Sequence, residues 1–283
     1  MLYVNFPVSF YTLRLCVKIL DLFGNSGWLS RKSCIFKFKG CEDAIFNLEV
    51  VQKLKFPNNS IGVFLLGIIF TGGKGPQAVV IKNLIGRETS GAFFIAADSG
   101  LALAEQAGVK CDFIIGDMDS LDVTRLASYP EDRIIRMQPD KDFTDTELAV
   151  FLAVEKGCDK IWIIGGGGGR IDHLFGIRSL FERDFFPHRW ITDEADIYCI
   201  DANSDENPLS LNPGEGACVS VFPLGAGPWK AKSSSLKWQL DKLKWDRGFF
   251  GLSNVAVDGW FMITAEAGRF MVILPEASPE KLL

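Results

Sequence analysis

The sequence has few of the features that mark a disulfide-rich, zinc-binding or nucleic-acid-binding protein. Its seven cysteines are scattered, odd in number and form no Cys-x-x-Cys pair, which argues against a disulfide framework and a zinc site. The net charge of −5 leaves no basic surplus of the kind that nucleic-acid-binding proteins carry. We therefore expect reduced, mostly buried thiols in a cytoplasmic protein with no nucleic-acid partner.

Long apolar runs are also missing. Residues 61–70, IGVFLLGIIF, are very apolar, but ten residues are too few to cross about 30 Å of hydrocarbon as a helix. Two glycines follow at once, so a buried strand fits better. The first 23 residues are apolar too, but Arg14, Lys18 and Asp21 interrupt them. We expect neither a secretory signal nor a membrane partner.

What the sequence does contain predicts a folded chain with a large core. It has 283 residues, 48% of them hydrophobic, and 23 Phe, enough for one large domain or two ordinary ones. Residues 1–60 keep no clear period and end at the turn-forming Pro57-Asn58-Asn59-Ser60. We expect them to be an N-terminal extension of unknown role, poorly packed against the remainder.

Residues 61–190 alternate between apolar runs and helical windows. The runs that indicate buried strands are residues 62–70, 92–96, 112–115, 133–137 and 160–164. Residues 99–107 and 144–156 are typical of helices, the second beginning with a capping box of Thr144 and Glu147. Alternating strands and helices predict a Rossmann-like α/β domain, with a parallel sheet covered on both faces.

Residues 191–283 have a different pattern. Short strands are indicated at residues 195–200, 217–222, 259–264 and 269–274, separated by glycine- and proline-rich turns. No helix of convincing length intervenes and tandem repeats are absent. The fold class we predict is therefore α/β, with a smaller antiparallel β domain, a sandwich or a barrel, after residue 190.

Four turns of the α/β region carry acidic or glycine residues, and each follows a predicted strand. Because ligands bind beyond the carboxyl ends of parallel strands, these turns are expected to meet at one site. Carboxylate oxygens are ligands that Mg²⁺ prefers, together with substrate phosphates. The sequence thus predicts a magnesium–triphosphate site. Its aspartates are Asp98, Asp117, Asp119, Asp145 and Asp172.

The same turns supply groups suited to phosphate. Lys141 offers a point charge and Arg170 a planar fork, although Lys141 is equally suited to a surface ion pair. Five consecutive glycines, residues 165–169, follow a buried strand, where backbone N–H groups can approach a polyphosphate closely. The run matches neither a P-loop nor a dinucleotide fingerprint, and a flexible linker is the alternative.

Other candidates carry less specific signals. His173 is either a proton shuttle or, as we favour, a hydrogen-bonded orienting residue. Trp238 could stack on a heteroaromatic cation or simply pack. Ser253 and Asn254 could bind a pyrimidine edge or close a turn.

The ordered set of motifs resembles the thiamin pyrophosphokinase family over about residues 62–275. It consists of Ala-Ala-Asp-Ser-Gly at 96–100, Gly-Asp-Met-Asp-Ser at 116–120, Asp-Lys-Asp-Phe-Thr-Asp at 140–145, the glycine run through His173, and Ser253-Asn254. The resemblance implies an α/β domain, a C-terminal β-sandwich and a homodimer with active sites between the two domains across the interface. It also implies Mg²⁺-dependent transfer of a pyrophosphoryl group from ATP to the hydroxyl of thiamin, releasing AMP.

The resemblance also implies roles for individual residues. The five aspartates would bind metal, and Asp117, Asp119 and Asp172 would be catalytic; either Asp119 or Asp172 would accept the hydroxyl proton. The groups that would hold the triphosphate are Lys141, Thr144, Gly166, Gly168, Gly169 and Arg170. Those that would hold thiamin are Trp238, Ser253 and Asn254.

Three residues depart from the family pattern: Ser99 and Ser235 stand where Gly is usual, and Ile177 stands near a common Asn. Two other functions stay open, a pyrophosphokinase acting on a pterin-like acceptor and a non-catalytic nucleotide or thiamin sensor.

Overall fold

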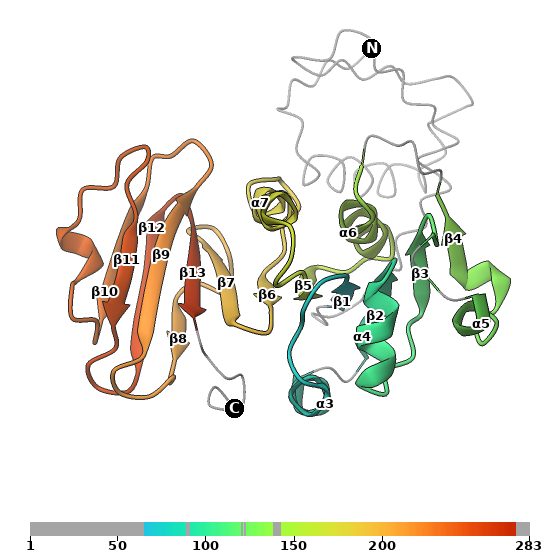
Figure 1. Ribbon diagram of the computed structural model, residues 1–283. Helices are drawn as coiled ribbons and strands as arrows, with labels where there is room; N and C mark the ends of the chain where they lie inside the picture. The colour runs from blue at the N-terminus through green and yellow to red at the C-terminus, as the bar shows by residue number, and fades with distance from the viewer. Residues whose placement is uncertain (1–64, 89–90, 120, 122, 138–142, 276–283) are drawn as a thin grey trace, which may run out of the picture. The chain divides into compact units, whose positions relative to one another are not determined.

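The computed structural model describes residues 65–88, 91–119, 121, 123–137 and 143–275 (Figure 1). All of them belong to the compact unit Ile61–Leu283. The predicted N-terminal extension, residues 1–60, and the predicted phosphate ligand Lys141 lie outside the described residues.

A ten-stranded sheet runs through this unit, and six of its strands are parallel to one another. The parallel strands are β1 (Leu66–Thr71), β2 (Phe93–Ala97), β3 (Phe113–Gly116), β4 (Ile134–Arg136), β5 (Lys160–Gly165) and β6 (Arg189–Ile191). They lie in the order β4-β3-β2-β1-β5-β6. The predicted apolar runs within the described residues thus fall on strands of this sheet.

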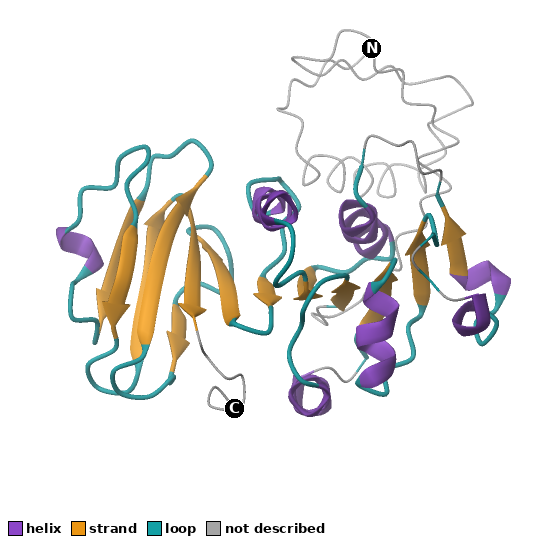
Figure 2. Cartoon of the chain, in the orientation of Figure 1, coloured by secondary structure: helices purple, strands orange, loops and turns teal. Residues whose placement is uncertain are grey.

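Helices cover both faces of the parallel strands. They are α3 (Ala78–Glu88), α4 (Gly100–Gln106), the short α5 (Val123–Leu126), the 3₁₀ turn η1 (Glu131–Arg133), α6 (Asp145–Glu155) and α7 (Ile171–Leu180). Buried side chains of α3 and α4 share one apolar cluster, whereas those of α6 and α7 share another. Figure 2 shows the two helix pairs on opposite sides of the sheet.

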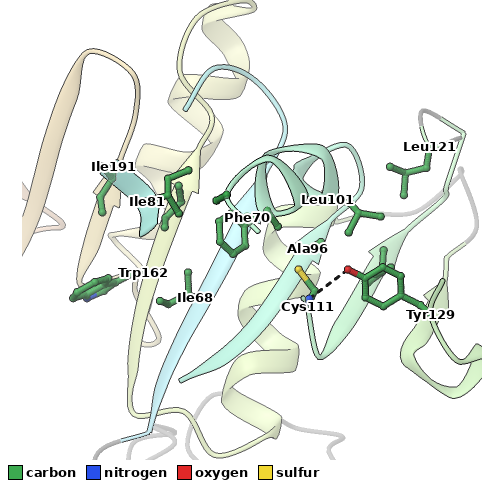
Figure 3. Packing of buried hydrophobic residues seen from close by; sticks show 14 of the residues in the cluster. Ile68, Phe70, Ile81, Ala96, Leu101, Cys111, Leu121, Tyr129, Trp162 and Ile191 are labelled. Carbon is green, nitrogen blue, oxygen red and sulfur yellow. Dashed lines mark hydrogen bonds between the residues drawn. The ribbon is translucent and has the colours of Figure 1, made fainter. Parts of the chain in front are cut away.

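Alternation along β1 explains why two clusters form. Ile68 and Phe70 face the α3–α4 side, as Figure 3 shows, and Ile69 faces the α6–α7 side. All three are fully buried, and burying each side chain is worth about 1.5–3 kcal/mol. At the edge of the first cluster, the backbone N–H of Cys111 donates to the hydroxyl of Tyr129 (3.4 Å).

The sheet continues as an antiparallel half. Its strands are β7 (Ala195–Asp201), β13 (Arg269–Pro275), β9 (Cys218–Leu224) and β11 (Gly251–Val255), following β6 in that order. A second sheet contains β10 (Lys230–Ser234), β12 (Phe261–Ala267) and β8 (Leu209–Leu211), and the 3₁₀ turn η2 spans Leu240–Lys242. Side chains from both sheets, such as Phe261 and Phe270, form a third buried cluster.

The α/β fold class is as predicted, with one feature that the sequence did not indicate. Strand β6 spans the predicted domain boundary at residue 190, pairing in parallel with β5 and antiparallel with β7. The sheet therefore crosses that boundary without interruption. The division into an α/β domain and a sandwich domain stays a prediction.

The capping box predicted at the start of α6 is confirmed. The Thr144 backbone N–H donates to Glu147 Oε2 (2.8 Å), and the Glu147 N–H donates to Thr144 Oγ1 (3.3 Å). The predicted capping box is thus present, and it satisfies two donors at the helix start. Helix α3 and the short strands β6, β8, β10 and β11 were not predicted.

The described cysteines are free thiols. Cys111, Cys158 and Cys199 are buried, and burial raises the pKa of Cys111 and of Cys158 to about 12, which keeps them protonated. None of the helices in the described ranges has both the length and the apolarity that a membrane crossing needs.

Stability at mildly acidic pH depends on His188, which lies just before β6. The N–H of Ile161 donates to its Nδ1 (3.2 Å), and its ring stacks on Phe186. Burial is the main cause that lowers the pKa of His188. The unfolded chain therefore takes up a proton first, near pH 6.5, so this contribution is complete above that pH and is lost as pH falls.

We expect the free energy of unfolding to fall as the pH is lowered from about 7 to 5, and to fall less in His188→Asn. The amide oxygen of Asn can accept the same hydrogen bond but does not titrate. Urea unfolding at a series of pH values measures this. Identical pH dependence in the two proteins would contradict the role given to His188.

Candidate active site

The strand order places a switch point between β1 and β5. The chain leaves β1 toward α3 on one face of the sheet and leaves β5 toward α7 on the other. Ligands of open α/β sheets bind beyond the carboxyl ends of the strands at such a point. The loops that follow these two strands, residues 72–77 and 166–170, are thus expected to lie at a ligand-binding site.

The two loops are joined by backbone hydrogen bonds. The N–H of Lys74 donates to the carbonyl of Gly167 (2.5 Å), and the N–H of Gly167 donates back to the carbonyl of Lys74 (2.8 Å). The N–H of Gly166 donates to the carbonyl of Gly72 (2.8 Å). Part of the glycine run is therefore held in a fixed conformation, in contrast to the flexible linker considered as an alternative.

Close packing explains why glycines are needed here. A Cβ on Gly166 would lie 2.5 Å from Ile177 Cδ1 and 3.3 Å from Trp190 Nε1, and its φ of +75° is left-handed. Trp190 Nε1 donates to the carbonyl of Gly165 (2.8 Å). The run is thus buried up to Gly167, whereas its last two members, Gly168 and Gly169, are exposed.

Two of the predicted aspartates meet beside β3. Gly116 ends that strand, and a Cβ there would lie 3.0 Å from Asp98 Cβ and 3.4 Å from Asp145 Oδ1. The N–H of Asp98 donates to the carbonyl of Ile115 (2.9 Å), so β2 and β3 end side by side. Two aspartates from turns 47 residues apart in the sequence therefore both lie against Gly116, and their shared role in a metal site stays a prediction.

The next turn holds the second pair of aspartates. Met118 has a left-handed backbone (φ 66°) and a buried side chain, so the turn is anchored between Asp117 and Asp119. The Asp119 N–H donates to Asp117 Oδ1 (3.0 Å). Asp117 is partly buried and Asp119 is exposed.

A side-chain hydrogen bond connects these turns to the glycine loops. Thr71 Oγ1, at the end of β1, lies 2.6 Å from Thr146 Oγ1, in the first turn of α6. Thr146 follows Asp145, which lies beside Gly116. The ends of β5, β1, β2 and β3 therefore form one continuous rim that carries the glycine run and four of the five aspartates.

Asp172 has a different partner. Arg170 Nε and Nη2 donate to its two carboxylate oxygens (3.1 and 2.5 Å), and these hydrogen bonds lower the pKa of Asp172. Among the residues that the structure describes, no three His, Cys, Asp or Glu side chains are grouped closely enough to hold a metal ion. The five-aspartate metal set therefore stays a prediction.

Two other predicted residues have local roles. The Thr144 hydroxyl takes part in the capping box of α6. His173 is exposed, and its backbone N–H donates to the carbonyl of Arg170 (3.2 Å). Their parts in catalysis and phosphate binding remain predictions.

The predicted thiamin-binding residues lie around β11. Asn254 is buried; its Oδ1 accepts from the N–H of Trp238 (3.0 Å), and its Nδ2 donates to the carbonyl of Trp238 (2.6 Å). The Trp238 ring is 51% exposed, and Lys237 Nζ lies 4.7 Å from its centroid. Asn254 thus fixes the backbone of a segment that carries a half-exposed Trp side chain.

Two serines near Trp238 have a left-handed backbone. Ser235 has φ 58°, and Ser253 has φ 56°. Both are in the left-handed region that favours glycine, so the Gly that is usual at position 235 fits this conformation.

Within one chain, the predicted thiamin-binding residues around β11 are far from the rim. β11 is separated from β5 by four strands, and at about 4.8 Å per strand this amounts to about 24 Å. The structure therefore places the glycine run and four of the aspartates on one rim, and separately brings Trp238 and Asn254 together, but does not join the two groups.

Lys74, Thr71 and Thr146 were missed by sequence reasoning. The segment Thr-Gly-Gly-Lys-Gly at 71–75 does carry a signal, a lysine among glycines directly after a buried strand. Its pairing with a loop more than 90 residues later is a non-local contact that no local pattern indicates.

The packing of Gly166 generates a stability prediction. We expect Gly166→Ala to lower the free energy of unfolding by about 1–3 kcal/mol, because the new methyl group meets Ile177 and the left-handed backbone is strained. Gly176→Ala is the matched control. Gly176 lies in α7, where an added Cβ would have no atom within 4 Å, so this substitution should raise the free energy of unfolding by about 0.5–1 kcal/mol. Urea titration measures both, and equal unfolding midpoints for Gly166→Ala and the unmodified protein would refute the packing argument.

Comparison with known proteins agrees with this geometry. The family model of the thiamin pyrophosphokinase catalytic domain matches residues 88–186. A thiamine pyrophosphokinase of Bacillus subtilis (strain 168) is 34% identical over 104 residues, which make up 36% of this chain and 48% of that protein. The alignment therefore spans about half the length of that relative.

Solved structures with similar folds cover more of the chain. Thiamine pyrophosphokinase from Bacillus subtilis has a TM-score of 0.58 and 21% identity, covering 75% of this chain and 98% of that one. Thiamin pyrophosphokinase from Candida albicans has a TM-score of 0.57 and 14% identity, and the match covers 75% of this chain and 89% of that one. The yeast enzyme has a TM-score of 0.54 and 16% identity, and the match covers 82% of this chain and 91% of that one. These likenesses concern the fold, and the sequence similarity to the thiamin pyrophosphokinase catalytic domain covers residues 88–186.

Proposed function

We propose that the protein transfers the pyrophosphoryl group of ATP to the hydroxyl of thiamin, giving thiamin diphosphate and AMP. The observation that carries this proposal is the catalytic-domain match over residues 88–186, which contains all the acidic turns and the glycine run. The meeting of Asp98 and Asp145 beside Gly116 supports it. A pterin-like acceptor and a non-catalytic sensor are the rival functions.

The acidic rim fits a magnesium ion. Asp98 and Asp145 both lie against Gly116, and Asp117 is the next residue along the chain. Mg²⁺ usually takes one or two protein carboxylates, with the rest of its shell from water and phosphates. These residues would hold it. Bound there, Mg²⁺ supplies positive charge against the phosphate oxygens.

The glycine loop would bind the triphosphate. Gly168 and Gly169 are exposed directly before α7, where backbone N–H groups and the helix dipole favour phosphate oxygens. Arg170, Thr144 and Lys141 would add donors. The thiamin hydroxyl would then attack the β-phosphorus in line, with AMP as the leaving group.

Asp119 is the better candidate for accepting the hydroxyl proton. Arg170 lowers the pKa of Asp172 through two hydrogen bonds, which makes Asp172 a weaker base. Asp119 is exposed on the rim. We therefore assign Asp119 as the general base and Asp172 to positioning Arg170.

A second copy of the chain would complete the site. Trp238 and Asp119 are on opposite halves of one long sheet, whereas in-line attack needs reacting atoms about 3–3.5 Å apart. A homodimer in which the open face of Trp238 covers the partner's rim would meet this requirement. We also place the reaction in the cytoplasm, where free thiols such as Cys111 stay reduced.

Complementation between two variants tests the proposal. Incubation with ATP, Mg²⁺ and thiamin should yield AMP and thiamin diphosphate. Asp119→Asn should lower kcat about a hundredfold or more, and Trp238→Ala should raise KM for thiamin. Mixing and refolding the two should restore about a quarter of the activity, since random pairing makes half of the dimers mixed and each then has one intact site.

Asp132→Asn and Trp260→Ala serve as matched controls, because both side chains are exposed and lie in none of the motifs. Both should behave like the unmodified protein. Absence of thiamin diphosphate would refute the activity, and activity without recovery in the mixture would refute the shared site.

A further inference from the structure

The loop after β1 contains a lysine to which neither the motifs nor the proposed mechanism assign a role. Lys74 lies in the segment Gly72-Gly73-Lys74-Gly75, at the switch point of the sheet. Its backbone N–H and carbonyl both bond to Gly167. The lysine is therefore attached at its backbone to the middle of the glycine run.

The Lys74 side chain follows the run toward α7. A Cβ on Gly168 would lie 2.8 Å from Lys74 Cδ, 3.1 Å from Cγ and 3.2 Å from Cε. The aliphatic stem thus lies directly on Gly168, and any larger residue at this position would displace it. Packing of the stem reduces the conformational entropy that the side chain would lose on binding a ligand.

The ammonium group of Lys74 is free to bind an anion. Lys74 is exposed, and among the described residues no ion pair to its Nζ is found, whereas the nearby Arg170 is engaged with Asp172. A cation held over exposed glycine N–H groups, without a carboxylate partner, is suited to a phosphate group.

We propose that Lys74 binds the polyphosphate chain of the nucleotide, so that the paired glycine loops and this lysine form one phosphate cradle. The inference rests on the proposed ATP site at this rim, and adds to it a positive charge from the β1 loop. Lys74 contacts the glycine run, so we expect its charge to act on the nucleotide rather than on thiamin.

Lys74→Met isolates the charge, because Met retains an unbranched stem that packs on Gly168. We expect its Kd for MgATP, measured by calorimetry without thiamin, to rise about tenfold or more, the usual effect of losing a charged hydrogen bond. The Kd for AMP should change less, and KM for thiamin should stay unchanged. Weaker dependence of MgATP affinity on ionic strength should accompany the loss.

Lys82→Met is the matched control, an exposed lysine of α3 outside the rim, and should bind MgATP like the unmodified protein. Equal thermal midpoints for Lys74→Met and the unmodified protein would show that the fold is intact.

The inference is overturned if Lys74→Met binds MgATP within about twofold of the unmodified protein, or if the unmodified protein does not bind MgATP. The titration needs no turnover, so the two proposals can fail separately. Binding that depends on Lys74 without formation of thiamin diphosphate would refute the proposed function alone. Formation of thiamin diphosphate with unchanged binding in Lys74→Met would refute the role of Lys74 alone.

Discussion

The backbone pairing between the loops after β1 and β5 is the constraint on which the rest of the site depends. Hydrogen bonds between Lys74 and Gly167 and between Gly166 and Gly72 fix two chain segments that emerge on opposite faces of the sheet. Such pairing requires close backbone approach, and Ile177 leaves no space for a side chain on Gly166. The glycines are thus needed first for packing, and the exposed end of the run is then presented to a ligand.

Most of the described parallel sheet could be predicted from sequence, because buried strands form apolar runs and the turns between them carry strong local signals. The capping box at Thr144 followed from such signals. Helix α3 was missed, and strand β6 is only three residues long. The junction of the two sheet halves at β6, and the contact of Lys74 with Gly168, arise from tertiary packing and have no local pattern.

Backbone strain marks the same places as the motifs. The non-glycine residues with left-handed φ in the described part of the chain are Asp98, Met118, Ser235 and Ser253. Each such conformation costs on the order of 1–3 kcal/mol and persists where surrounding structure imposes it. Asp98 and Met118 lie in turns of the acidic rim, and Ser235 and Ser253 lie close in sequence to Trp238 and Asn254. Within the second pair of turns, Asn254 hydrogen-bonds the Trp238 backbone, and its role in thiamin binding stays a prediction.

We expect the paired glycine loops to be rigid before a nucleotide binds. Hydrogen exchange of individual amides, followed by NMR without and with MgATP, tests it most directly. The amides of Lys74, Gly166 and Gly167 donate within the paired loops and should exchange slowly in the nucleotide-free protein, whereas the exposed Gly169 should exchange fast and slow down when MgATP is added. Rapid exchange of Gly166 and Gly167, equal to that of Gly169 before nucleotide is present, would contradict the account.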